Sequence, residues 1–241
     1  MKIKAYIIFC ILLSSPSFAT TWSNIQVQDP ILKNEKCDVA TPRSYGSYIY
    51  HWPSKYDQVF WPHTTGHGIW FCKKSGFTAF IGDFKNLSPN EILAIKKYLR
   101  STYKNQSRFV GKLELLEGVY KLRKKKKFFK NHLLRVLAYN YEQTGNIKKA
   151  TEYRKTALTD MESALKGKLP ANIRLTYLYV IANYHREFAN NKKSDQYLEK
   201  LLTAMKSLKD KKYIGFAQYL KKLSTDTKKI TPGGKLMPSR K

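Results

Sequence analysis

Apolar side chains recur every three or four positions along most of the later part of the chain, a spacing that places them on one face of a helix. The first such stretch follows Ser88-Pro89-Asn90-Glu91. A Ser cap, a Pro in the first turn and a Glu three residues after the cap together indicate a helix start. Glycine and proline separate the later stretches. We therefore expect further helices at about 107–123, 127–144, 146–166, 171–190, 192–208 and 210–223.

Small and aromatic residues in these stretches follow a repeat-like pattern. Ala138 and Ala150 lie where two helices would touch closely, Tyr141 would fill the groove between them, and Gly145 permits the turn. A weaker copy surrounds Ala182, at a longer spacing than the roughly 34 residues of a tetratricopeptide repeat. The pattern favours irregular tetratricopeptide-like hairpins, with a generic antiparallel helical bundle as the alternative.

The region before the helices has a different composition. Residues 45–84 contain short aromatic runs separated by glycine and proline, which is typical of strands and turns. We expect a hairpin of strands 68–72 and 77–81 with Gly76 in its turn, and a third strand at 47–52. The predicted fold class is α+β and predominantly α, with a small aromatic strand-rich N-terminal module followed by an antiparallel helical array.

The first 19 residues have the pattern of an export signal. Lys2 and Lys4 precede an uncharged apolar run at 5–13 that is too short to span a bilayer, and small residues end at Ala19. We expect a periplasmic or secreted protein with no transmembrane segment in its mature chain. The expected organisation is a signal peptide at 1–19, a β-rich module at 20–87, a helical repeat domain at 88–224 and a basic disordered tail at 225–241.

The formal charge is +28, from 45 Lys and Arg against 17 Asp and Glu. This excess favours an acidic protein or peptide, or an anionic envelope component, as partner. Nucleic acid is not favoured, because the basic residues are spread along the chain and the chain is expected to be exported.

The densest basic run is 121–130. It could contact an anion or a membrane surface, with Phe128 and Phe129 as apolar anchors. The alternative is an interhelix connection whose two Phe side chains enter the core. The anion-binding candidates are Arg123, Lys124, Lys125, Lys126, Lys127 and Lys130.

Two cysteines, Cys37 and Cys72, remain outside the expected signal. In an exported chain they are most simply a disulfide. The competing interpretation is a zinc site formed by Cys37, His63, His67 and Cys72, because imidazole and thiolate suit zinc. No Cys-x-x-Cys pair is present to nucleate such a site, so we expect no cofactor, with zinc as the alternative.

The motifs of common enzyme classes are absent from the sequence. There is no Gly-x-Ser-x-Gly elbow, no His-Glu-x-x-His pair and no phosphate-cradling glycine-rich loop. We therefore expect no catalytic residues. A metal-dependent enzyme that uses His63 and His67 is the alternative.

Three short segments carry a resemblance to a known family: Cys37-Asp38-Val39, the run from Trp70 to Phe80, and Gly82-Asp83-Phe84. With the helices that follow, they resemble a bacterial family of unknown function that combines a zinc-ribbon-like segment with tetratricopeptide-type helices. In that family Cys72 would open a Cys-x-x-Cys-Gly knuckle, whose second position here is Ser75. Asn34 stands where a partner of Cys37 would be expected. The resemblance therefore implies a degenerate ribbon that a disulfide could staple in place of a metal, and it implies no reaction.

Taken together, the sequence predicts an exported, non-catalytic binding protein. Its concave helical surface would engage a protein, a peptide or an envelope component. The alternatives are a metal-dependent enzyme or zinc-binding protein that uses the His63/His67 region, and a binder of anionic membrane or polymer surfaces.

Overall fold

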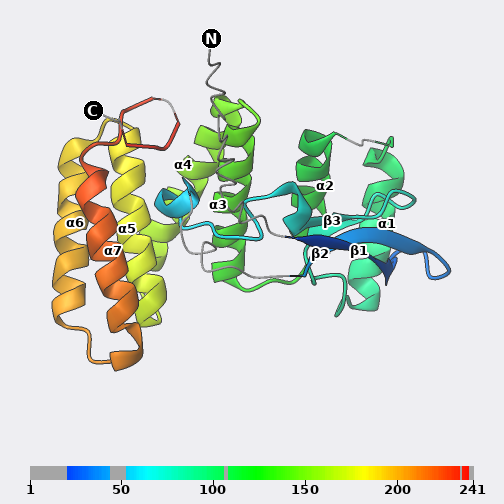
Figure 1. Ribbon diagram of the computed structural model, residues 1–241, viewed down its shortest axis with the longest axis horizontal. Helices are drawn as coiled ribbons and strands as arrows, with labels where there is room; N and C mark the ends of the chain where they lie inside the picture. The colour runs from blue at the N-terminus through cyan, green and yellow to red at the C-terminus, as the bar shows by residue number, and fades with distance from the viewer. Residues whose placement is uncertain (1–20, 44–52, 106–107, 234, 239–241) are drawn as a thin grey trace, which may run out of the picture.

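The computed structural model describes residues 21–43, 53–105, 108–233 and 235–238, and Figure 1 presents the arrangement of its elements. Two antiparallel strand pairs and several short 3-10 helices precede or interrupt a row of α-helices. The fold is α+β and predominantly α, which confirms the predicted fold class. The predicted export signal at 1–19 and the predicted strand at 47–52 lie outside the described residues.

The longest strand pair was not anticipated from the sequence. Strands β1 (Trp22–Gln28) and β2 (Lys36–Pro42) pair antiparallel with Val27 opposite Cys37. Polar residues fill much of both strands, so they lack the aromatic runs that identified the second pair. That second pair, β3 (Ile69–Phe71) and β4 (Thr78–Phe80), confirms the predicted hairpin. Gly76 has a positive φ of 78° in its turn, and a Cβ there would meet the ring of Tyr103 at 2.4 Å.

The helices follow the predicted periodicity closely. Helix α1 (Pro89–Thr102) begins with a capping box in which Ser88 and Glu91 satisfy each other's backbone N–H groups. Asn146 and Asn190 cap the starts of two later helices with their side chains. The remaining helices are α2 (Phe109–Lys121), α3 (Lys127–Gln143), α4 (Ile147–Ala164), α5 (Ala171–Glu187), α6 (Asn191–Lys206) and α7 (Ile214–Thr227).

Helices α3 and α4 form one antiparallel hairpin, and α5 and α6 form another. The small residues of the repeat-like pattern are where the helices meet, since Ala138, Ala150 and Ala182 are fully buried. The ring of Tyr141 stacks on that of Tyr153, with centroids 5.5 Å apart. The structure therefore uses these positions as the pattern predicts.

Two apolar clusters stabilise the chain. The first joins both strand pairs to α1, α2 and α3, and the second lies among α4, α5, α6 and α7. The strand-rich module is also fixed by polar contacts, because Asp83 accepts a hydrogen bond from Tyr120 and forms ion pairs with Arg123 and Lys125. The module and the helices thus share a core instead of meeting across a thin linker.

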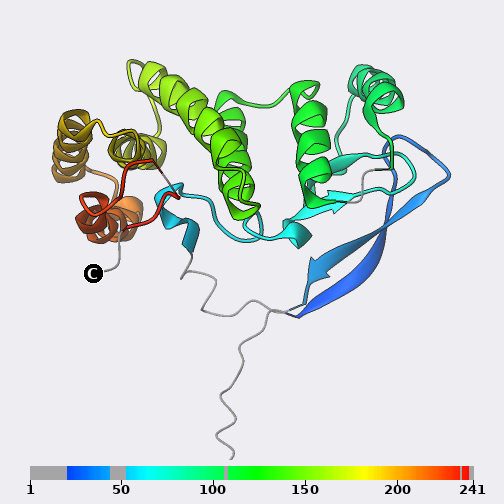
Figure 2. The same cartoon turned by 90° about the horizontal axis from the view of Figure 1, so that it is seen from above.

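A segment far from α5 in the sequence crosses the helical row. We call residues 53–59, which include the short 3-10 helix η2 (Pro53–Tyr56), the strap. Figure 2 shows the cyan chain running along one side of the row, from the region of α5 and α7 towards α2. Ser54, Asp57 and Val59 in the strap are all buried.

The end of the chain also differs from the prediction of a disordered tail. Helix α7 continues to Thr227, and Ile230 and Leu236 beyond it are buried in the second apolar cluster. An isolated bridge pairs Ile230 with Pro238. The polar composition concealed these two apolar anchors.

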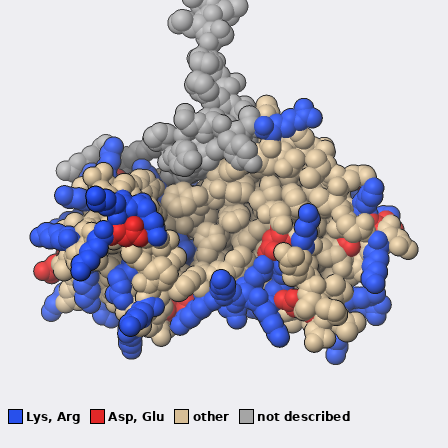
Figure 3. Space-filling model, turned by 90° about the horizontal axis from the view of Figure 1, so that it is seen from below, with Lys and Arg blue, Asp and Glu red and all other residues tan. Residues whose placement is uncertain are grey.

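The surface is strongly basic over part of the molecule. Figure 3 shows Lys and Arg side chains crowded over the left end, where the C-terminal helices lie, with others along the lower centre and the right edge, and a broad tan surface in the upper centre. In the described part of the chain, no helix combines the length and the apolar character that crossing a bilayer requires.

Candidate functional site

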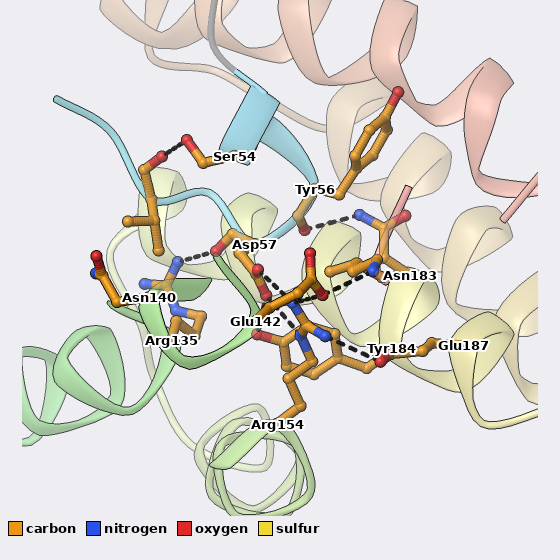
Figure 4. Close-up of polar contacts among 12 residues, drawn as sticks. Ser54, Tyr56, Asp57, Arg135, Asn140, Glu142, Arg154, Asn183, Tyr184 and Glu187 are labelled. Atoms are coloured by element: carbon orange, nitrogen blue, oxygen red, sulfur yellow. Dashed lines mark hydrogen bonds and ion pairs between the residues drawn. The ribbon is translucent and has the colours of Figure 1, made fainter. Parts of the chain in front are cut away.

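Arg154 of α4 is the centre of a buried ion cluster. Its guanidinium lies 2.9 Å from Asp57 Oδ2, 2.7 Å from Glu142 Oε2 and 2.9 Å from Glu187 Oε1. These four residues, which we call the clamp, come from the strap and from helices α3, α4 and α5 (Figure 4). All four side chains are nearly inaccessible to solvent. The clamp therefore joins four segments of the chain and offers no surface to a substrate.

Further hydrogen bonds hold the strap on the helices. Arg135 of α3 donates to the backbone carbonyls of Asp57 and Gln58, at 2.7 and 3.0 Å. On α5, Asn183 donates to the carbonyl of Tyr56, and the Tyr184 hydroxyl donates to Asp57 Oδ1 at 2.7 Å. The helices thus bind a turn-rich segment through its backbone and one acidic side chain, and that segment belongs to the same chain.

The clamp contains one basic side chain, that of Arg154, and three acidic ones. Burial opposes the charge of Arg154, but Asp57, Glu187 and Glu142 around it raise its pKa well above the ordinary value. Burial also raises the pKa of Glu187 to about 7, with Asp57 and Glu142 adding to the rise and Arg154 opposing it. Near neutral pH the clamp is therefore poised to hold a proton on Glu187.

The C-terminal tail closes over the same cluster. The backbone N–H of Leu236 donates to Glu142 Oε2 at 2.8 Å, and that of Gly233 donates to the Glu187 carbonyl at 3.0 Å. The strap and the tail together occupy this side of the helical row.

An open groove lies elsewhere on the helices, among α4, α5 and α6. Its volume is about 1240 Å³. On α5 it is lined by Arg174 and Leu178, whereas the strap contacts Asn183 and Tyr184 further along the helix. The groove and the strap therefore use different residues of the same central helix.

Tyr197 is the aromatic residue that lines the groove, and the charged residues of the lining are three basic and two acidic: Lys166, Arg174, Lys200, Glu162 and Glu199. Glu162 accepts hydrogen bonds from Tyr197 at 3.2 Å and lies 3.0 Å from the ring nitrogen Nε2 of His185. Burial, together with Glu162, raises the pKa of Tyr197 to about 12, so its hydroxyl stays protonated. Lys166 and Lys200 are exposed at the edges. The groove can therefore offer both apolar contact and positive charge.

The predicted disulfide residues are joined in the structure: Cys37 of β2 and Cys72 after β3 form a disulfide. The histidines of the alternative zinc site do not join them. His63 stacks on Phe80, and its Nδ1 lies 3.1 Å from Nε2 of His132. Burial lowers the pKa of His63 to about 4, so it is neutral near pH 7.

His67, the other histidine of that set, stacks on Trp22 with ring centroids 4.7 Å apart. Among the described residues, the potential metal ligand that lies beside the two cysteines is instead the carboxylate of Asp29.

The basic run at 121–130 is partly used inside the protein. Arg123 is buried and, with Lys125, pairs with Asp83. Phe128 and Phe129 pack against the two apolar clusters, so they are not exposed anchors. The other candidates lie at or near the start of α3: Lys124, Lys126, Lys127 and Lys130. The structure therefore favours the interhelix connection for this run.

Sequence reasoning missed the clamp, although one signal was present. Arg154 lies between Ala150 and Ala157 at helical spacing, on a face that is otherwise buried. A charged residue on such a face requires a partner. Nothing in the local sequence identifies Asp57, which is 97 residues away, as that partner.

These features define a class: a helical-hairpin protein whose array is joined to a small strand-rich module and crossed by its own strap. Residues 47–224 match a protein family described as uncharacterized protein conserved in bacteria (DUF2225), and the chain belongs to this family. The predicted resemblance to a bacterial family of unknown function is thereby confirmed. The matched range includes Cys72 but not Cys37 or the β1–β2 hairpin. A search of curated proteins and a search of solved structures each found no match.

Proposed function

We propose that the protein is an exported, non-catalytic binding protein that takes an acidic peptide, or an acidic segment of a protein, into the groove among α4, α5 and α6. The main observation behind the proposal is that one part of the helical surface is covered by the chain itself and another part is open. The strap and tail fill one side, and a groove of about 1240 Å³ stays open among other residues of the same helices.

The groove has the chemistry that an acidic segment with apolar residues requires. Lys166, in the turn just after α4, and Lys200 of α6 are both exposed where they line the groove, so they can pair with carboxylates of a bound segment. Leu165, Tyr197 and Ala204 are partly exposed where they line the groove and supply its apolar contact area. Arg174 is committed to the helix connection, because it donates to the carbonyl of Gly167 at 2.9 Å.

Export is the second part of the proposal. It rests on the basic start and apolar run of residues 1–19 and on the Cys37–Cys72 disulfide, which suits an oxidising compartment. A fusion of residues 1–30 to a reporter that is active only after export tests it directly. Activity in the periplasmic or extracellular fraction is expected, and its loss on Ile8→Asp should accompany it. A reporter retained in the cytoplasm would contradict export.

The binding test uses a fluorescein-labelled peptide that repeats Glu-Leu-Glu-Tyr, followed by fluorescence anisotropy. Reversing the two rim charges, in the Lys166→Glu/Lys200→Glu variant, should weaken binding about tenfold or more, equivalent to about 1.4 kcal/mol. The control is Lys148→Glu/Lys192→Glu, which makes the same charge change at exposed positions on α4 and α6 outside the groove. Its affinity should stay within about twofold of the wild type.

Two outcomes would overturn the proposal. Equal weakening in both charge-reversal variants would mean that the probe senses only the total charge. Absence of peptide binding, combined with salt-sensitive binding to vesicles that contain phosphatidylglycerol, would replace a peptide groove with an anionic surface.

A further inference from the structure

Asp29 is a buried acid with an unused oxygen. It follows β1, its side chain is 2% exposed, and its Oδ1 accepts hydrogen bonds from the backbone N–H groups of Ile31 and Leu32. Within the described ranges, its other oxygen, Oδ2, has no hydrogen-bond partner. A buried carboxylate oxygen without a donor is costly, so its place in the fold requires an explanation.

The disulfide lies directly beside this carboxylate. One ligand atom from each of Asp29, Cys37 and Cys72 lies within 4.8 Å of the other two, and all three residues are buried. The hairpin produces this arrangement. Val27 pairs with Cys37, and Asp29 follows two positions later, so it continues on the same face of the extended chain.

We infer that Asp29, Cys37 and Cys72 form a zinc site when the disulfide is reduced. Two thiolates and one carboxylate are ligands that zinc accepts, at about 2.3 Å for sulfur and about 2.0–2.2 Å for oxygen. The Cα atoms of the two cysteines are 4.9 Å apart, so rotation of their side chains is sufficient to separate the sulfurs around one ion. A water molecule completes four ligands, as in other three-ligand zinc sites.

The two states exclude each other, and the chemistry between them balances. A dithiol reductant delivers two electrons and two protons to the disulfide, which becomes two thiols while the reductant becomes a disulfide. Zinc binding then releases the two thiol protons, because the thiolate is the metal ligand. The site is therefore open to metal only in the reduced protein.

The surroundings match the charge of the loaded site. Zinc with two thiolates and one carboxylate has a net charge of −1. Cys37 lines a pocket of about 550 Å³ whose other residues include Lys36, Lys73 and Lys112. These cations can stabilise a negatively charged zinc site across the pocket. In the oxidised protein Cys37, which is then part of an uncharged disulfide, lines the same pocket as these lysines, and Lys112 lies over the ring of Phe71, 5.0 Å from its centroid.

The test is a cobalt and zinc titration of the full-length chain, reduced with a dithiol and then freed of reductant without air. The reduced protein should bind one Zn²⁺ per chain by native mass spectrometry. With Co²⁺ it should develop a sulfur-to-cobalt charge-transfer absorption, and the oxidised protein should do neither. Asp29→Asn should weaken Co²⁺ binding at least about tenfold, because even groups behind the ligands change metal affinity by about 10–100-fold.

The controls separate a ligand role from a general effect. Asp38→Asn changes an exposed acid next to Cys37 and should leave the affinity unchanged, as should His67→Ala. Circular dichroism of each variant verifies that it is folded. No charge-transfer band in the reduced wild type would overturn the inference. Equal affinity of the Asp29→Asn and Asp38→Asn variants, or loss of binding in His67→Ala, would overturn the assigned ligand set.

Discussion

Asp57 and Arg154, 97 residues apart in the chain, form an ion pair of 2.9 Å with both side chains buried. The pair fastens the strap to α4, and Glu142 and Glu187 extend it to α3 and α5. Its consequence is architectural: the side of the helices that would otherwise be open to a ligand is covered by the chain itself.

Removing the central cation should be strongly destabilising. In Arg154→Met, three buried carboxylates would lose their shared partner, and breaking a buried ion pair from one side costs about 3–5 kcal/mol. Urea unfolding followed by circular dichroism should report a loss of this size. Lys155→Met, at the exposed neighbouring position, is the matched control and should change stability by less than about 0.5 kcal/mol. Similar midpoints for the two variants would mean that the clamp contributes little to folding.

The clamp could not have been located from the sequence, whereas the helices could. Periodicity and caps identify helices because they depend on neighbours within a few positions, as in the capping box of Ser88 and Glu91. The contact between Asp57 and Arg154 depends instead on how α4 packs against a segment from the other end of the chain. The β1–β2 hairpin was not predicted for a related reason. Its strands are largely polar, and they are stabilised by pairing with each other and by burial of a few residues such as Cys37 and Val39.

Candidate sites divide in the same way. The disulfide was predictable because an expected exported chain with two cysteines outside its signal allows one pairing within the chain. The alternative zinc site named the wrong neighbours for the two cysteines. His63 and His67 are close to Cys72 in the sequence, but their rings contact His132 and Trp22 instead of the sulfurs. Asp29, which follows β1, lies beside the two sulfurs, and its spacing from the cysteines in the sequence matches no common metal-ligand pattern.

Stability should fall as pH rises from about 5 to 7 because of Glu187. Its pKa is raised from 4.5 to about 7 in the folded protein, so between these values the folded chain holds a proton that the unfolded chain releases. A group of this kind favours folding fully below pH 4.5, and the benefit is lost as pH rises through 7. The effect is on the order of 3 kcal/mol.

Thermal unfolding of wild type and Glu187→Gln at pH 5.0 and 7.5 measures this contribution. The variant cannot ionise at this position, so its stability relative to wild type should be greater at pH 7.5 than at pH 5.0. Glu152→Gln, an exposed change on α4, controls for the loss of a surface charge. An identical pH dependence in wild type and Glu187→Gln would show that Glu187 is ionised throughout this range.

Reduction of the disulfide should destabilise the strand-rich module. The bond closes a loop with a sequence separation of 35, for which the chain-entropy model gives about 4 kcal/mol. Wild-type protein should therefore unfold at a lower urea concentration after treatment with a dithiol and a metal chelator. The Cys37→Ser/Cys72→Ser variant should match the reduced wild type and should not respond to the reductant. A reductant response in this variant would assign the effect to something other than the bond.

The tail should contribute to folding through Leu236 in particular. This side chain is 4% exposed within the second apolar cluster, and its N–H donates to Glu142 of the clamp. Leu236→Ala removes buried methyl groups and should cost about 2 kcal/mol, the low end of the range for buried leucines. Met237→Ala, at an adjacent residue that is 45% exposed, should cost less than about 0.5 kcal/mol.

Urea midpoints of the two tail variants, together with the rate of cleavage by trypsin after Lys228 or Lys229, measure the difference. If the tail is docked as the structure has it, Leu236→Ala should accelerate cleavage there, and Met237→Ala should not. The strap should stay protected in both variants, because Arg154 and Arg135 hold it independently of Leu236. Equal cleavage of wild type and Leu236→Ala would contradict docking of the tail, and would leave Glu142 paired with Arg154 alone.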